Sequence, residues 1–210
     1  MKTAYPVTFA VDFPDRSLDR LTTAFRIIVA IPIAIVLTLL TGASLHYVTT
    51  SNATSETVTL ATGGGVLFLP LVLMIVFRQK YPRWWFDWNL NLFRFSNRVT
   101  AYLALLDDRY PSTDEEQAVH LNLAYPDARQ LNRWLPLVKW FLAIPHYVVL
   151  LFLGIGAVVA VIVAWFAIVF TGRYPQNLFR YVVGVLRWSN RVTGYAFLLV
   201  TDQYPPFQLS

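Results

Sequence analysis

The sequence predicts an all-α integral membrane protein with four transmembrane helices, arranged as two parallel repeats of two spans each. Three observations carry this prediction: an apolar composition, four long apolar runs and an internal duplication. Hydrophobic residues make up 56% of the 210-residue chain and charged residues 14%, whereas a soluble domain is about 25% charged. The chain contains no cysteine, which excludes a disulfide framework, a thiolate metal site and a cysteine nucleophile.

Four apolar runs are long enough to be membrane spans, which need about 17 to 25 residues. The predicted transmembrane helices cover about residues 25–45, 61–77, 135–153 and 155–170. Little more than Gly154 and Gly156 separates the third run from the fourth. We therefore expect these two spans to form a tight helical hairpin.

The basic residues predict an orientation for these spans. All 17 lysines and arginines lie within residues 2–26, 78–139 and 173–191. Short loops rich in Lys and Arg stay in the cytoplasm, so both termini and the central segment are expected there, in a multi-pass protein of the inner (cytoplasmic) membrane. The net charge of +5 is then a signal of topology, and no nucleic-acid partner is expected.

The two halves of the chain, residues 1–112 and 113–210, resemble one another. "RFSNRVT" begins at Arg94 and "RWSNRVT" at Arg187, and each half ends in Asp-x-Tyr-Pro. A duplication of this kind indicates two copies of one structural unit. Each half is expected to contain, in order, a short strand, two spans and an amphipathic helix.

Alternating apolar residues predict the two strands, at residues 7–13 and 119–125. An isolated strand leaves its backbone groups unpaired. We therefore expect the two strands to pair with each other or with a partner chain.

The amphipathic helices are predicted at about residues 83–106 and 176–199, lying in the cytoplasmic membrane interface. Their aromatic side chains would sit at headgroup depth, with the anchors Trp84, Trp85, Trp88 and Trp188. The polar stripe is predicted to contact lipid headgroups or the other half, through Arg94, Asn97, Arg98, Arg187, Asn190 and Arg191. Two interpretations stay open: a helix that braces the spans, or a site for anionic lipid phosphate. A third, in which each amphipathic helix is itself a span, would place arginine in hydrocarbon at high cost.

Several other ionisable residues stand out. Asp107, Asp108 and Asp202 follow the predicted amphipathic helices, where acids oppose the helix dipole, so a basic partner is expected, first an arginine of the other half. His146 lies inside the third predicted span, and a hydrogen bond between helices is favoured there over a proton relay. The histidines have no metal-ligand spacing, and the sequence predicts no metal, no cofactor and no catalytic residue.

The combined motifs resemble a known family. A basic residue lies before "AIP" in each half, "YP" follows a predicted span, and "SNRVT" and the final Asp-x-Tyr-Pro complete the pattern. This pattern resembles the bacterial domain-of-unknown-function 4389 family, here as two tandem copies over nearly the whole chain. The resemblance implies a bacterial membrane location and brings no established activity.

These observations favour a non-enzymatic integral membrane protein that is an accessory or scaffolding subunit of a membrane complex. Its expected partners are membrane lipids, in particular anionic ones, and other membrane subunits or further copies of itself. The first alternative is a protein that binds or handles anionic lipid through the arginine stripe. The second is an oligomeric channel or transporter, although the spans carry few polar residues to line a path.

Overall fold

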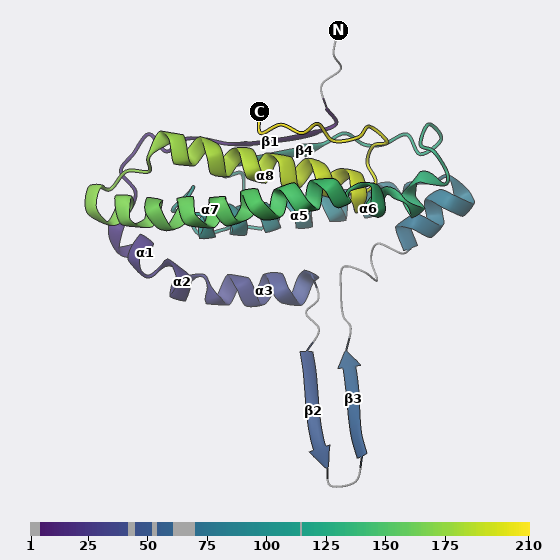
Figure 1. Cartoon of the computed structure of the whole chain (residues 1–210), viewed down its shortest axis with the longest axis horizontal. Coiled ribbons are helices and arrows are strands. Elements are labelled where there is room, and N and C mark those ends of the chain that lie inside the picture. The colour runs from purple at the N-terminus through teal and green to yellow at the C-terminus, as the bar shows by residue number, and fades with distance from the viewer. Residues whose placement is uncertain (1–4, 42–44, 52–53, 61–69, 114) are drawn as a thin grey trace.

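The computed structural model describes residues 5–41, 45–51, 54–60, 70–113 and 115–210 (Figure 1). The elements of the first half are β1 (Val7–Val11), α1 (Arg20–Ala24), α2 (Arg26–Val29), α3 (Ile31–Thr41), β2 (Leu45–Ser51), β3 (Thr54–Leu60), η1 (Met74–Arg78) and α5 (Arg83–Leu103). The second half contains β4 (Val119–Leu123), η2 (Leu135–Leu137), α6 (Lys139–Leu142), α7 (Ile144–Thr171) and α8 (Gln176–Ala196).

The prediction of four transmembrane helices is wrong. Among the described residues, one helix, α7, is long and apolar enough to cross a membrane. The first predicted span instead forms α2 and α3 and is followed by strand β2. Part of the second predicted span, residues 61–69, lies outside the described residues, and residues 70–78 are helical with a π-helical last turn.

The third and fourth predicted spans are one continuous helix, α7, so the expected hairpin turn is absent. Gly156 serves close packing between helices: a Cβ there would lie 2.5 Å from the hydroxyl of Tyr181, which donates to the carbonyl of Leu153 at 3.0 Å. The helix ends at Gly172, whose φ of 74° is the left-handed conformation typical of a helix end. Because the turn is absent, the cytoplasmic placement of both termini rests on the charge pattern alone and stays a prediction.

Strands β1 and β4 form a two-stranded antiparallel sheet in which Val7 pairs with Leu123 and Phe9 with Leu121. Each strand ends two residues before its predicted boundary. Val7, Phe9 and Val11 are buried and the residues between them are exposed, as the apolar alternation predicted. The sheet thus buries one face against the helices and leaves the other exposed.

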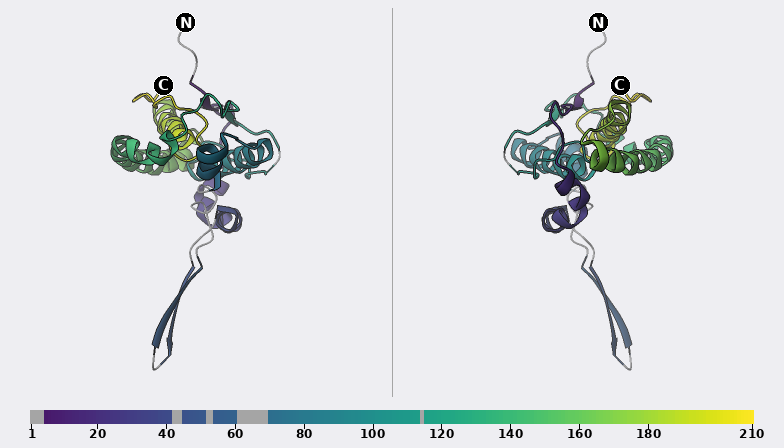
Figure 2. Two further views of the ribbon diagram at one scale, coloured as in Figure 1. Left: turned by 90° about the vertical axis from the view of Figure 1, so that its right-hand side faces the viewer. Right: turned by 90° about the vertical axis from the view of Figure 1, so that its left-hand side faces the viewer.

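A second sheet, which the sequence did not predict, lies in the connection between the first two predicted spans. β2 and β3 pair antiparallel from Leu45–Leu60 to Ser51–Thr54. This segment is rich in Thr and Val, whose branched side chains favour strands. The hairpin extends away from the helices in every view (Figures 1 and 2).

The two halves exchange their strands. Helix α8, from the second half, packs against β1 and α7, whereas α5, from the first half, packs against β4 and α3. The β1–β4 sheet lies on one side of the layer of α5, α7 and α8, and α3 lies on the other (Figure 1). Figure 2 shows α7 and α5 on opposite flanks of the molecule.

The helices leave a large apolar surface exposed. On α7 it comprises Leu151, Phe152, Ile155, Val158, Val159, Ile162, Val163, Phe166 and Phe170. Around α1, α2 and α3 it comprises Leu21, Phe25, Ile27, Ile28, Ile31 and Ile35. Ile27 is 82% exposed and Phe170 73% exposed. An exposed apolar surface of this extent is typical of a region that contacts a membrane or another protein.

Two glycine substitutions are expected to have opposite effects. A Cβ at Gly194, in α8, would lie 2.6 Å from Cγ2 of Val7 in β1, so Gly194→Ala should lower the free energy of unfolding by about 1–3 kcal/mol through overpacking. A Cβ at Gly154 meets nothing within 4 Å, so Gly154→Ala should raise the free energy of unfolding by up to about 1 kcal/mol through helix propensity. Thermal unfolding followed by circular dichroism in detergent micelles compares the two variants. A destabilised Gly154→Ala protein would contradict a continuous α7.

Candidate functional site: the arginine–asparagine stripe

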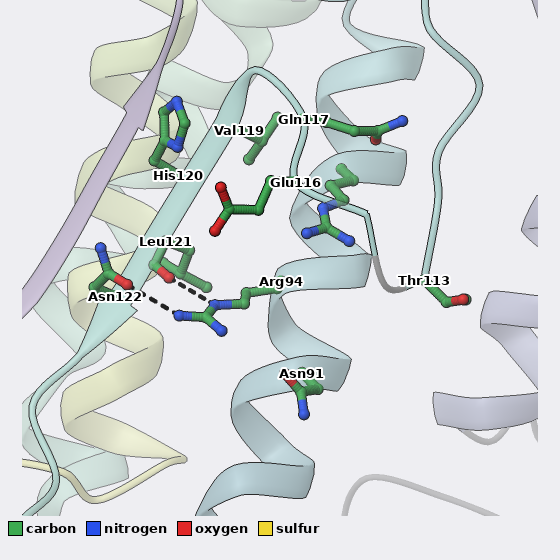
Figure 3. Close-up of a pocket in the computed structure, with 10 residues that line it drawn as sticks. Asn91, Arg94, Thr113, Glu116, Gln117, Val119, His120, Leu121 and Asn122 are labelled. Atoms are coloured by element: carbon green, nitrogen blue, oxygen red, sulfur yellow. Dashed lines mark hydrogen bonds between the residues drawn. The ribbon is translucent and has the colours of Figure 1, made fainter.

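On α5, two arginines of the polar stripe bind protein carbonyls. Arg94 donates from Nε to the carbonyl of Leu121 and from Nη2 to Oδ1 of Asn122, both at 2.9 Å (Figure 3). Arg98 donates from Nη1 to the carbonyl of Ser112 at 2.8 Å. Arg94 thereby connects the first half to the strand of the second half.

On α8, the matching arginines bind in the same manner. Arg187 donates from Nε to the carbonyl of Phe9 in β1 at 2.9 Å and from Nη1 to that of Leu209 at 3.2 Å. Arg191 donates to the carbonyls of Gln208 and Ser210, at 3.4 and 2.7 Å. Burial and, next, the positive charge of Arg187 lower the pKa of Arg191.

The two arginines that reach the sheet protect its edges. Phe9 and Leu121 are paired in the sheet, and each carbonyl accepts a bond from the helix that lies beside its strand. Figure 3 shows Arg94 on the side of β4 that faces away from β1. An unpaired strand edge is a template for pairing with another chain, and a guanidinium bound there makes such pairing harder.

Asn97 and Asn190 join α5 to α8. Nδ2 of Asn190 donates to Oδ1 of Asn97 at 2.7 Å, and both residues are 5% exposed. Asn97 also donates to the carbonyl of Phe93 at 2.9 Å. The structure therefore brings the two copies of the heptapeptide into direct contact, and each of the six predicted stripe residues bonds to protein atoms.

Asn97→Ala is expected to lower the free energy of unfolding by about 1–3 kcal/mol, because it leaves the buried amide of Asn190 without an acceptor. Asn89 is a matched control: its side chain donates to the carbonyl four residues earlier at 2.7 Å, as Asn97 does, but reaches no second asparagine. Asn89→Ala should cost under about 1 kcal/mol. Equal losses, measured by chemical unfolding in micelles, would contradict a role for the contact between halves.

Each half also holds a buried cation over a tyrosine ring. Arg26 is 2% exposed, lies 4.2 Å from the ring centroid of Tyr102 and donates to that residue's carbonyl at 3.0 Å and to the carbonyl of Asp107 at 2.5 Å. Burial lowers the pKa of Arg26, while Tyr102 and nearby acids act to raise it. The similarity between the two halves predicts a basic residue before "AIP" in each half, but it does not predict that Arg26 contacts Tyr102 and Asp107.

In the second half, the buried cation is Lys139, which is fully buried. Its Nζ lies 2.7 Å from the carbonyl oxygen of Thr201, 2.7 Å from Oδ1 of Asp202 and 5.2 Å from the ring centroid of Tyr195. Burial lowers the pKa of Lys139, and the hydrogen bond that Lys139 donates to Asp202 opposes that shift.

The acids after the amphipathic helices pair within their own halves, so the expectation of a cross-half arginine is wrong. Asp202 binds Lys139, Asp108 pairs with Arg16, and Asp107 pairs with Arg109 at 3.2 Å. The chain turns back after each helix and brings its acid to a basic residue near the start of the same half.

His146 lies among aromatic side chains and is fully buried. Nε1 of Trp188 donates to its Nδ1 at 3.1 Å, and the ring of Phe207 stacks on it with centroids 4.0 Å apart. This is the hydrogen bond between helices that the sequence favoured.

The four tryptophans predicted as interfacial anchors differ in exposure. Trp188 is only 4% exposed. Trp84 is 67% exposed and Trp88 41% exposed, and Trp85 is partly buried between them.

An open polar groove of about 480 Å³ lies between α5, β4 and the segment that precedes β4 (Figure 3). It is lined by Asn91, Arg94, Arg98, Thr113, Glu116, Gln117 and Val119–Asn122. Arg94 and Glu116 place opposite charges along it (Figure 3). Among the described residues, no group of three or more His, Asp or Glu side chains gathers to hold a metal ion.

The comparison with known families concerns the second half of the chain. Residues 134–208 match DUF4389, a domain of unknown function. One copy is found, not the two tandem copies expected from the sequence. The DUF4389 segment contains α6, α7 and α8, and with them Lys139, His146, the second arginine stripe and Asp202. Searches of curated proteins and of solved structures gave no significant match.

Proposed function

We propose that this is an integral membrane protein that serves as an accessory or scaffolding subunit of a membrane complex. The observation that carries the proposal is the exposed apolar surface of α7 and of α1 to α3. In the most apolar 18-residue window of α7, with a mean hydropathy of 2.9, only 11% of the residues are buried. The core helix of a soluble protein would be mostly buried, and a lipid bilayer is the environment in which such a surface is stable.

Aromatic residues near the ends of this surface favour lipid over a protein partner as its main cover. Trp134 and Trp140 lie just before α7 and are 65% and 52% exposed, and Trp84 lies at the start of α5. Tryptophan is enriched where a protein passes through the headgroup region. We expect α7 to face hydrocarbon and the β1–β4 sheet to face water.

The scaffolding role is supported by the way the two halves are joined. Strand exchange, the Asn97–Asn190 bond and the two arginines bound to strand carbonyls join the halves into one unit. The matched positions of Arg26 and Lys139, and of Arg94 and Arg187, further support an origin as two tandem copies of one unit. A unit with a lipid-facing side and a polar side can hold other subunits at a membrane.

Membrane placement is testable by cysteine labelling, because the chain has no cysteine of its own. Single cysteines at Val158 and Ile162, on the apolar side of α7, should resist a water-soluble maleimide in open membrane sheets until detergent is added. Cysteines at Thr8 and Asn122, on the exposed face of the sheet, should react at once. Rapid labelling at all four positions, with release of the protein by alkaline carbonate, would overturn the membrane assignment.

The accessory role needs a separate measurement. After mild detergent extraction, native mass spectrometry should find the chain bound to another polypeptide in fixed stoichiometry. A monomer that carries only anionic phospholipid would overturn the scaffolding role in favour of lipid binding. Either result is independent of the labelling experiment.

A further inference from the structure

The two arginine stripes are covered to different extents. On α8, the C-terminal segment Gln208–Ser210 lies along the stripe of Gly184, Arg187 and Arg191. All three of its carbonyls accept bonds from the two arginines. A Cβ on Gly184 would lie 3.0 Å from both Cβ and the carbonyl oxygen of Leu209, so the segment is in direct contact with the helix.

On α5, the same places in the helix are held by Asn91, Arg94 and Arg98, and these three residues line the open groove. The chain after α5 touches this stripe at one end, where the carbonyl of Ser112 accepts from Arg98. Thr113, Glu116 and Gln117 line one side of the groove, and among the described residues the space beside Asn91 and Arg94 is left open (Figure 3). The volume of about 480 Å³ lies within the roughly 300–1,000 Å³ typical of ligand sites.

We propose that this groove binds an extended, uncharged peptide segment of a partner chain, in the place that Gln208–Ser210 takes on α8. The proposal rests on the accessory role proposed above and names the surface that would serve it. Arg94 bonds to Leu121 and Asn122 through two of its nitrogens and keeps further N–H donors for a peptide carbonyl. The amides of Asn91, Gln117 and Asn122 match the donors and acceptors of a peptide backbone.

Two observations favour a peptide over a lipid phosphate. The carboxylate of Glu116 lines the same groove as Arg94 and repels an anion. The groove also borders β4, and the sheet lies on the side of the helix layer opposite to α3, whose side chains form part of the apolar surface (Figure 1). A headgroup held at that apolar surface is therefore remote from Arg94.

The test is peptide binding by the purified full chain in detergent, measured by fluorescence anisotropy. The probe is a peptide with the sequence of residues 204–210, YPPFQLS, labelled at its N-terminus and amidated at its C-terminus so that it carries no charge; it contains the segment seen on α8. Arg94→Ala should weaken binding about tenfold or more, since it removes a charge-assisted donor. Asn91→Trp should block binding by filling the groove, and Arg180→Ala, on the exposed surface of α8, should leave it unchanged.

Each other outcome overturns the proposal. Absence of binding at the highest soluble peptide concentration excludes the site, and binding that is unaffected by both groove variants places the peptide elsewhere. Displacement of the peptide by excess inorganic phosphate, together with Arg94-dependent binding to vesicles of phosphatidylglycerol, identifies a headgroup site instead. Circular dichroism of each variant shows whether a loss of binding reflects a loss of folding. None of these results alters the cysteine-labelling outcome, so failure of this site and failure of the membrane assignment are distinguishable.

Discussion

Asp202→Asn is expected to lower the free energy of unfolding by about 3 kcal/mol, because it leaves the buried cation of Lys139 without its carboxylate. Lys139 is fully buried, and Asp202 supplies the carboxylate that neutralises it at 2.7 Å. Removing one partner of a buried ion pair leaves an uncompensated charge and costs about 3–5 kcal/mol. The lower end applies because the carbonyl of Thr201 and the amide oxygen of the new asparagine still accept from Nζ.

The loss in free energy of unfolding caused by Asp202→Asn should depend on pH. Burial lowers the pKa of Lys139 and the hydrogen bond that it donates to Asp202 raises it, so Asp202→Asn lowers that pKa further below its ordinary value of about 10.5. At pH values between the pKa of Lys139 in the folded variant and its pKa in the unfolded variant, the unfolded chain binds more protons than the folded chain. The free energy of unfolding of the variant therefore rises with pH. The difference from the wild-type protein should be larger at pH 7 than at pH 9.

Asp108→Asn is the matched control, because Asp108 holds the corresponding place in the first half. Its partner, Arg16, has a side chain that is 61% exposed, and an exposed pair contributes about 0–1 kcal/mol. The double variant Lys139→Met/Asp202→Asn should be less destabilised than Asp202→Asn alone, because it removes the buried charge. Chemical unfolding in micelles at both pH values measures all four proteins. Similar losses for Asp108→Asn and Asp202→Asn would contradict the buried-charge explanation.

His146→Ala is also expected to cost about 3 kcal/mol, because it empties a fully enclosed site. The ring fills the space between Trp188 and Phe207, and truncating a buried aromatic to alanine costs about 3–5 kcal/mol when the site cannot collapse. His146→Phe separates packing from hydrogen bonding: it keeps the stacked ring and removes the acceptor of the Trp188 indole.

The phenylalanine variant should therefore lose about 1–3 kcal/mol, the cost of leaving one buried donor unpaired. Thermal unfolding followed by tryptophan fluorescence in micelles ranks the two variants. If His146→Phe is as unstable as His146→Ala, the stacking on Phe207 is not what stabilises this site. If both variants match the wild-type protein, His146 has no structural role.

The membrane spans were the part of the fold that sequence reasoning placed wrongly. Length and apolarity cannot distinguish two short spans from one long helix, and Gly154 and Gly156 were interpreted as a turn. In the structure, α7 continues through both glycines because the helix interior tolerates Gly at a cost of about 1 kcal/mol each. The close approach of Tyr181 to Gly156 is a tertiary contact with no local signal.

Local patterns, in contrast, predicted the elements that carry the candidate site. The period-two alternation around Phe9 and Leu121 and the helical period around Arg94 and Arg187 are both short-range, and the strands and amphipathic helices lie where these patterns placed them, with ends shifted by two to three residues. The repeated heptapeptide also indicated that one structural role occurs twice.

Sequence patterns alone place the key residue types: an arginine and an asparagine on the polar stripe of both helices, and a basic residue before both "AIP" motifs. The partners of these residues follow from the fold. Arg94 and Arg187 bind strands of the opposite halves, whereas Lys139 binds the acid of its own half. A buried donor must find an acceptor, but which acceptor it meets depends on how elements distant in the chain pack together.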